Sequence, residues 1–232
     1  MFYDLSHARV VNKDDNKRIA VIPLGSMEYH GETLPLLTDT LIAENISRKC
    51  LAKYAEITSV SIYLYPGIYL GFSHEWLRYA GTISLEPHIY LGMIESVVKS
   101  IDENIDPHGY LFVNGHGGNY SLLEVFARKY YFSLKKPVLI IDLWRIASHY
   151  GLHYCHACRE EVMLYSYLVE KKTGGASNDI VVDSGSENDC LRGYYKDMDI
   201  GGRGSLSISI EEYVCRVCEI IDSAIKHIID QG

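Results

Sequence analysis

The chain has 232 residues, of which 47% are hydrophobic and 22% charged, a composition typical of globular proteins. Its length fits one α/β domain, so we take 1–232 as a single unit. A net charge of −8 without Lys/Arg-rich runs argues against a nucleic-acid partner. We also expect a cytoplasmic protein without membrane contact, because a signal-like start and an apolar run of about 18 residues are both missing.

Short apolar runs alternate along the chain with longer segments of helical periodicity. The predicted strands are 18–25, 57–68, 81–85, 109–115 and 137–143. The predicted helices are 39–54, 87–105, 119–134 and 211–229, and a further helical pattern begins at Glu161. Near-continuous apolar strands separated by helices indicate a mostly parallel sheet covered on both faces. We therefore expect a three-layer α/β fold with a mostly parallel central sheet flanked by helices.

The segment 173–205 is rich in Gly, Ser, Asn and Asp and has no sustained period. Loops of this length in compact domains are often functional. The segment is therefore predicted to be a long loop, either a lid over a site or an ordinary connection.

Six cysteines are scattered along the chain, unlike the dense pattern of a secreted disulfide scaffold, so reduced thiols are expected. Two CxxC pairs, Cys155/Cys158 and Cys215/Cys218, could hold structural zinc in a non-enzymatic protein. The second pair lies inside the predicted helix 211–229, whereas zinc pairs usually need a turn between the ligands. We favour small, buried core residues as their role.

Polar residues follow two of the predicted strands, in GSMEYHGETLPLLTD (25–39) and in NGHGGN (114–119). The carboxyl ends of parallel strands share one edge of a sheet, so these two loops should meet where ligands bind. Glu28 and His30 are two residues apart and would point the same way in an extended segment. Both side chains could therefore face one metal site.

Asp39 lies at the turn into a predicted helix, and its carboxylate could bridge two cations about 3.5–4 Å apart. His116 lies among glycines that allow the backbone to approach a ligand. Each residue also has a structural interpretation: Asp39 or Thr38 could cap the helix, His116 could be a hydrogen-bonded loop residue, and Glu28 could be a surface acid. Their combination at one sheet edge favours a metal site, and mixed oxygen and nitrogen donors suit Zn, Mn or Fe(II).

A third polar cluster, HACREEV, begins at His156. Glu161 could complete a second metal site there, and His156 could act as a general acid or proton shuttle. Alternatively, Glu161 is a first-turn acid favoured by the helix dipole.

Together these segments resemble the creatininase (creatinine amidohydrolase) family, whose pattern reads roughly GSxEQHGxHLPLxTD, NGHGGN and HAGExET. The segment SHEWLRYAGTISL (73–85) is similar to a further family stretch that ends in PGTISL. The resemblance covers about residues 20–165. It implies the family's parallel-sheet α/β layer fold. The resemblance also implies a homo-oligomer, because members of the family often assemble as hexamers.

The resemblance also implies two divalent metal ions, Fe(II), Zn or Mn, and a ligand set. One ion would be held by Glu28, Asp39 and His116, and the other by His30, Asp39 and Glu161, with Asp39 as the bridge. A hydroxide between the ions would attack an amide carbon, and His156 would pass a proton to the leaving nitrogen.

Several positions depart from the family pattern. Gly118 stands where creatininase proper has a glutamate ligand, which favours Glu161 as its replacement. Trp76 stands where many members have histidine, and Cys158 and Arg159 change the HAGE motif. The tryptophans that sandwich creatinine have no counterpart before His156, so creatinine is not the first choice of substrate.

The glycine-rich central motif is shared with the archaeal-type deformylase branch of the family. The first expectation for a small, nitrogen-rich substrate is therefore 2-amino-5-formylamino-6-ribosylaminopyrimidin-4(3H)-one 5'-monophosphate, an intermediate in riboflavin and deazaflavin synthesis. Arg78, Arg192 and Arg203 are candidate phosphate contacts. The alternatives are a creatinine-like cyclic amide and peptide cleavage by a maturation peptidase of the same family.

Overall fold

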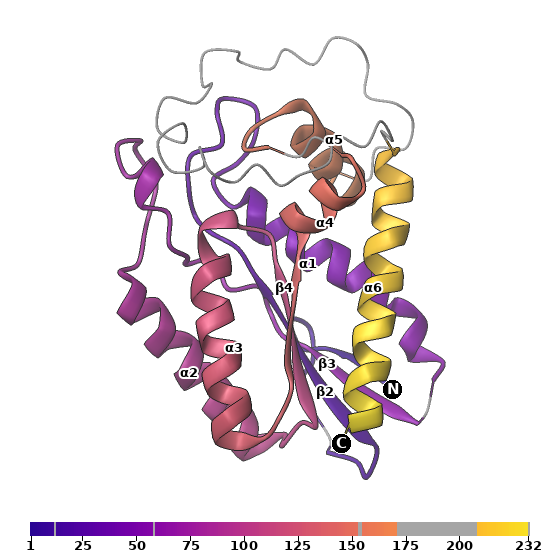
Figure 1. The fold of residues 1–232 in the computed structure, drawn as a ribbon. Helices are drawn as coiled ribbons and strands as arrows, with labels where there is room; N and C mark the ends of the chain where they lie inside the picture. Colours follow the sequence, from indigo (N-terminus) through magenta and orange to yellow (C-terminus); the bar gives the residue numbers. More distant parts are fainter. Residues whose placement is uncertain (12, 58, 153–154, 171–207, 232) are drawn as a thin grey trace.

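The computed structural model describes residues 1–11, 13–57, 59–152, 155–170 and 208–231 (Figure 1). A parallel sheet of five strands has the order β1-β3-β2-β4-β5. The strands are β1 (Phe2–Asp4), β2 (Lys17–Leu24), β3 (Val60–Leu64), β4 (Gly109–Asn114) and β5 (Val138–Asp142). The predicted parallel sheet is confirmed, and β1 is an edge strand that the sequence did not indicate.

Helices cover both faces of this sheet. They are α1 (Thr38–Leu51), α2 (Pro87–Asn104), α3 (Tyr120–Leu134), α4 (Leu143–His149), α5 (Arg159–Leu168) and α6 (Ile210–Gln231). Figure 1 shows α2 and α3 on one side of the sheet and α6 on the other, and α1 contacts both α5 and α6. The predicted three-layer α/β architecture is confirmed.

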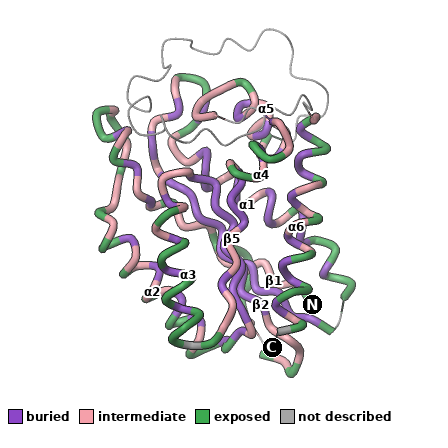
Figure 2. Tube along the Cα trace, in the orientation of Figure 1, coloured by how far each residue is buried: buried purple, intermediate pink, exposed green. Residues whose placement is uncertain are grey.

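Alternate residues of the central strands belong to two separate hydrophobic cores. Ile19 and Val21 of β2 pack into the core under α1 and α6, whereas Ala20 and Ile22 pack into the core under α2 and α3. The centre of the sheet is accordingly drawn as buried in Figure 2, and β3 and β4 are buried along their whole length. Burial of both faces explains why these strands are uninterrupted apolar runs instead of alternating patterns.

The strand order places a topological switch point between β2 and β4. The chain leaves β2 for β3 on one side and returns through α2 to β4 on the other side of β2. At such a point the loops that follow the two strands diverge and leave a crevice outside their carboxyl ends. The loops that carry Glu28, His30 and His116 follow these two strands.

Two predicted strands differ from the structure. Residues 81–85 form no strand of the sheet; Ile83 makes one isolated antiparallel bridge to Met27, and Ser84 makes one parallel bridge to Gly71. The strand predicted over 57–68 is limited to β3, since Pro66 lacks the N–H that would continue the ladder. The segment 173–205, predicted to be a loop or lid, lies outside the described residues.

The expectation of reduced thiols is wrong for Cys50 and Cys218, which form a disulfide between α1 and α6. Cys218 therefore faces α1 and not a zinc ion shared with Cys215, whose side chain is exposed. Packing of α6 against α1 brings together two cysteines that are 168 residues apart in the sequence. In the described part of the chain, the structure has no helix that is long and apolar enough to cross a membrane.

Candidate metal centre

Five predicted ligands converge at the carboxyl edge of the sheet. Two come from the loop after β2, one from the loop after β4, and one each from the first turns of α1 and α5: Glu28, His30, His116, Asp39 and Glu161. All five are at most 3% exposed. Three carboxylates held this far from water require compensating positive charge.

One group of side chains consists of Glu28, Asp39 and His116, whose candidate ligand atoms lie within 4.8 Å of one another. His116 Nδ1 is 3.3 Å from Glu28 Oε1 and 3.0 Å from Asp39 Oδ2. One imidazole nitrogen therefore faces two carboxylates.

A second group consists of His30, Asp39 and Glu161 and meets the same 4.8 Å limit. His30 Nε2 is 3.1 Å from Asp39 Oδ1 and 3.9 Å from Glu161 Oε1. The two oxygens of Asp39 thus face different imidazoles, Oδ1 toward His30 and Oδ2 toward His116. This is the arrangement that a bridging carboxylate needs.

Backbone carbonyls fix the tautomers of both imidazoles. His30 Nδ1 lies 3.0 Å from Glu28 O, and His116 Nε2 lies 2.8 Å from Phe72 O. A carbonyl oxygen only accepts, so each of these nitrogens carries the proton. The other nitrogen, directed at the carboxylates, is then the one available to a cation, as in other histidine metal ligands.

The electrostatics of the centre favour cations. Burial alone would lower the pKa of His30, but the carboxylates of Asp39, Glu161 and Glu28 outweigh it and raise this pKa to about 10. The pKa of His116 is likewise raised against the effect of burial, by Glu28 and Asp39. Each imidazole thus takes up a proton wherever no metal ion occupies its place.

Two buried oxygens, Glu28 Oε2 and Glu161 Oε1, have no hydrogen-bond partner among the described residues. An unsatisfied carboxylate oxygen inside a protein costs free energy unless a cation or donor reaches it. Carboxylate oxygens together with imidazole nitrogens form a donor set that suits Zn, Mn and Fe(II). The residues present therefore fit a pair of divalent metal ions.

The structure differs from the structural alternatives for Asp39 and Glu28, whereas His116 is hydrogen-bonded to Phe72 O in its loop and also faces the carboxylates. The residue that caps α1 is Leu37, without a side-chain cap, so Asp39 is free for the centre. Glu28 is buried instead of exposed at the surface. Glu161 does lie in the first turn of α5, where the helix dipole favours an acid, and it also faces His30.

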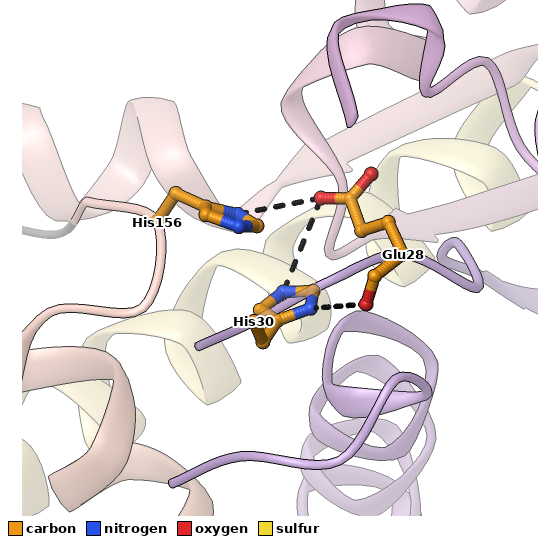
Figure 3. Close-up of side chains that lie close together, drawn as sticks. All are labelled: Glu28, His30 and His156. Atoms are coloured by element: carbon orange, nitrogen blue, oxygen red, sulfur yellow. Dashed lines mark hydrogen bonds and ion pairs between the residues drawn. The ribbon is translucent and has the colours of Figure 1, made fainter. Parts of the chain in front are cut away.

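His156 lies beside the first group, as Figure 3 shows together with Glu28 and His30. Its Nδ1 is 3.3 Å from Glu28 Oε1, and its Nε2 is 2.6 Å from Tyr29 O. Burial, followed by the nearby charge of His30, lowers the pKa of His156 to about 4. This imidazole is therefore neutral at pH 7 and able to accept a proton.

Sequence reasoning missed three side chains that support these residues. Ser26 Oγ donates to Asp39 Oδ2 at 2.7 Å, and Ser73 Oγ lies 3.2 Å from His116 Nε2. Trp76 stacks on His156, with ring centroids 3.9 Å apart. All three lie in segments that the sequence had singled out, 25–39 and 73–85, and Trp76 was noted there as a departure from the family pattern, but spacing alone did not indicate where these side chains point.

Asn119 joins the loops that carry the ligands. Its Nδ2 donates to Gly25 O at 3.0 Å, and its Oδ1 accepts from the N–H of Phe72 at 3.0 Å. The last residue of NGHGGN thereby links the loop after β4 to the loop after β2 and to the segment that contacts His116.

Two positions of the NGHGGN motif must be glycine, because the backbone of another segment lies too close for a side chain. A Cβ on Gly115 would collide with the backbone carbonyl oxygen of Asp39. A Cβ on Gly118 would collide with Phe72 O and lie 2.5 Å from His116 Nε2. Neither position can therefore carry a side chain without displacing a candidate ligand.

The fold and this cluster define an α/β protein with a buried carboxylate–imidazole centre at the switch point of a parallel sheet. The chain belongs to the creatininase family, since the family model described as creatinine amidohydrolase matches residues 3–174. A structure of the creatinine amidohydrolase type from Bacteroides fragilis has a TM-score of 0.70 and 16% identity, and covers 97% of this chain and 95% of its own. A creatininase structure named for Mn has a TM-score of 0.60 and 15% identity, with 91% of each chain covered. Both likenesses show the fold.

Two curated relatives have higher sequence identity over shorter stretches. The mycofactocin precursor peptide peptidase of Mycobacterium tuberculosis is 40% identical over 107 residues, which are 44% of this chain and 42% of that protein. The 2-amino-5-formylamino-6-ribosylaminopyrimidin-4(3H)-one 5'-monophosphate deformylase of Methanosphaera stadtmanae is 26% identical over 148 residues, 63% of this chain and 58% of that protein. The chain thus matches less than half the length of the peptidase.

Proposed function

We propose that this protein hydrolyses a carbon–nitrogen amide bond with the help of two divalent metal ions. Asp39 carries the proposal, because its two oxygens face separate imidazoles, His116 at 3.0 Å and His30 at 3.1 Å. Glu28, Asp39 and His116 would hold one ion, and His30, Asp39 and Glu161 the other. Bound there, the ions would make a water molecule more acidic and polarise the amide carbonyl group.

A residue of this chain would transfer the proton that the leaving nitrogen needs. Hydrolysis breaks the C–N bond, transfers the oxygen of water to carbon and leaves a nitrogen that needs a proton. His156 is neutral near pH 7 and its Nδ1 faces the centre, so it can take up a proton there and deliver it to the leaving nitrogen. Trp76 and the carbonyl of Tyr29 hold its ring in this orientation.

For the substrate, sequence similarity favours a peptide amide. The identity to the peptidase is 40%, against 26% to the deformylase, although the second match covers more of this chain. Deformylation of the formylaminopyrimidine nucleotide, the first expectation from the motifs, becomes the second candidate. Its phosphate would need cationic contacts: Arg78 is exposed and lies over the ring of Tyr79 at 4.9 Å, whereas Arg192 and Arg203 lie outside the described residues.

The first experiment measures metal content and hydrolysis on the same samples. Anaerobically purified wild type is compared with Asp39→Asn and with Glu44→Gln, a carboxylate on the outer part of α1 that pairs with Arg48. We expect about two metal ions per chain in wild type and Glu44→Gln, and loss of both ions in Asp39→Asn. Unchanged metal content in Asp39→Asn would reject the bridging role.

Both candidate substrates are assayed on these preparations. Cleavage of a precursor peptide, detected by mass spectrometry, supports the peptidase assignment, whereas formate release from the nucleotide supports deformylation. Two bound metal ions without either product would retain the centre and reject both substrates. The family resemblance also predicts a homo-oligomer, with the hexamer of other family members as the expected assembly. Light scattering on the purified protein tests this prediction.

A further inference from the structure

Cys155 and Cys158 flank His156 in a single turn that leads into α5. The N–H of Cys155 lies 3.1 Å from Cys158 Sγ, and the N–H of Cys158 donates to Cys155 O at 3.3 Å. Both side chains are half-buried, and neither takes part in the Cys50–Cys218 disulfide. Two thiols thus lie on the same turn as the candidate proton-transfer residue.

The same turn contacts both halves of the metal centre. His156 Nδ1 faces Glu28, and the N–H of Ala157 donates to Glu161 Oε2 at 2.5 Å. Ala157 has a φ of 54°, in the left-handed region that a non-glycine residue adopts at some cost. A change in the conformation of this turn would therefore move the imidazole that faces Glu28.

We propose that Cys155 and Cys158 form a reversible disulfide by exchange with a small-molecule disulfide, and that this disulfide displaces His156 from Glu28. The disulfide itself is independent of the proposed function, whereas its effect on hydrolysis rests on the role of His156.

The exchange requires a small-molecule disulfide as oxidant. The Cys158 thiolate attacks one sulfur of oxidised glutathione and expels one glutathione thiolate. The Cys155 thiolate then attacks the Cys158 sulfur, forms the intramolecular S–S bond and expels the second glutathione thiolate. The two cysteine protons end on the two glutathione molecules, and two electrons pass from the protein to the oxidant.

Cys158 is the better nucleophile of the two on geometric grounds. Its sulfur receives the N–H of Cys155, and it precedes the first residue of α5. A donated N–H and the amino end of a helix both favour a thiolate, the form that attacks disulfides. Cys155 is then the resolving thiol.

The bond would also constrain the turn. The candidate ligand atoms of Cys155, Cys158 and Glu160 lie within 4.8 Å of one another, so a local adjustment brings the two sulfurs to the about 2.05 Å of an S–S bond. Because His156 and Ala157 are the two residues between the cysteines, closing this ring constrains the backbone that carries the imidazole. Because Glu160 lies beside the two sulfurs, the three residues could instead bind a metal ion such as zinc. The experiment below distinguishes this metal site from a disulfide.

The experiment follows thiols by mass on the full, metal-loaded chain. Protein is equilibrated with reduced and oxidised glutathione at a series of ratios, quenched in acid, alkylated and digested. Wild type and Cys215→Ser, which removes an exposed thiol on α6, should lose both alkylation sites at Cys155 and Cys158 in one reversible transition. Cys158→Ser should retain a thiol at Cys155 that is alkylated or linked to glutathione, without an intramolecular bond.

Two results would overturn the disulfide. One is alkylation of both cysteines at every glutathione ratio. The other is protection of the two thiols that ends when a chelator removes zinc in equimolar amount, which would assign the pair to a metal. Both results are independent of hydrolysis, so they leave the proposed function untouched.

Fluorescence tests the displacement of His156, because Trp76 stacks on this ring. Oxidation should change the emission of wild type and Cys215→Ser, and should leave Trp76→Phe and Cys158→Ser unchanged. The Cys50–Cys218 pair is present in all four proteins, so its own redox state cancels in the comparison. A disulfide that forms without an emission change at Trp76 would reject the displacement.

Discussion

The indole of Trp76 lies against the imidazole of His156, with ring centroids 3.9 Å apart and an interplanar angle of 15°. The imidazole is also held by its hydrogen bond to Tyr29 O and faces Glu28. Its orientation therefore depends on an aromatic face that comes from a different loop. Because the tryptophan contacts the candidate proton-transfer group, its removal should affect turnover more than substrate binding.

Trp76→Leu should lower kcat by about 2–10-fold with a smaller change in KM, which corresponds to the about 0.5–1.5 kcal/mol of an aromatic pair. Trp76→Phe retains a ring and should recover most of the rate. Steady-state kinetics on the three proteins check this. An effect of Trp76→Leu confined to KM would instead make the indole a substrate contact.

Glu161→Gln should lower the metal content from about two ions to about one per chain, because the variant retains the Glu28, Asp39 and His116 group. The neighbouring Glu160→Gln is the matched control and should keep both ions. Elemental analysis of desalted protein gives the ratio directly. Two ions in both variants would remove Glu161 from the ligand set.

Metal binding should release protons, since the pKa of His30 is raised to about 10 in the metal-free centre. At pH 7 this imidazole is protonated, and a metal ion must displace its proton before it binds Nε2. Metal affinity should therefore rise with pH, by about tenfold per pH unit for each proton displaced. Calorimetry in buffers of different ionisation enthalpy measures the number of protons, and a pH-independent affinity would contradict the prediction.

Ser26→Ala removes the hydrogen bond to Asp39 Oδ2 while leaving every candidate ligand in place. Loss of such an outer partner typically weakens metal binding by about 10–100-fold. Ser47→Ala is the control. Ser47 is a buried residue of α1 whose hydroxyl donates to Ala43 O instead of to a candidate ligand. Competition with a metal-binding dye should give weaker binding in Ser26→Ala and wild-type affinity in Ser47→Ala.

Much of the fold could be predicted from local patterns. The runs 19–24 in β2, 110–113 in β4 and 138–141 in β5 have no charged residue to place on a solvent face, so a doubly covered parallel sheet follows from them. The three residues of β1 were too few to produce a pattern, and 81–85 was β-like in composition without being part of the sheet. A β-like composition shows only that a segment could fit a pleated sheet surface. A strand also needs a neighbouring strand to pair with, which composition does not reveal.

The positions of the candidate ligands were also accessible from sequence. Glu28, His30 and His116 follow strands whose carboxyl ends must share an edge in a parallel sheet, and the family motifs add Asp39 and Glu161. The sequence also predicted that these loops meet at one edge, but not the distances between individual side chains, because those depend on β2 and β4 being neighbours in the sheet. The same holds for Ser26, whose hydroxyl reaches Asp39 only because α1 begins beside the end of β2.

The sequence by itself determined the α/β class, the two loops that carry chemistry and the types of donor they contain, because these follow from periodicity and from residues near one another in the chain. Only the tertiary structure decided the pairing of Cys50 with Cys218 and the stacking of Trp76 on His156. It also decided the division of Asp39 between two imidazoles. Such contacts join segments far apart in the sequence, and they depend on the packing of whole helices and loops, which no local pattern encodes.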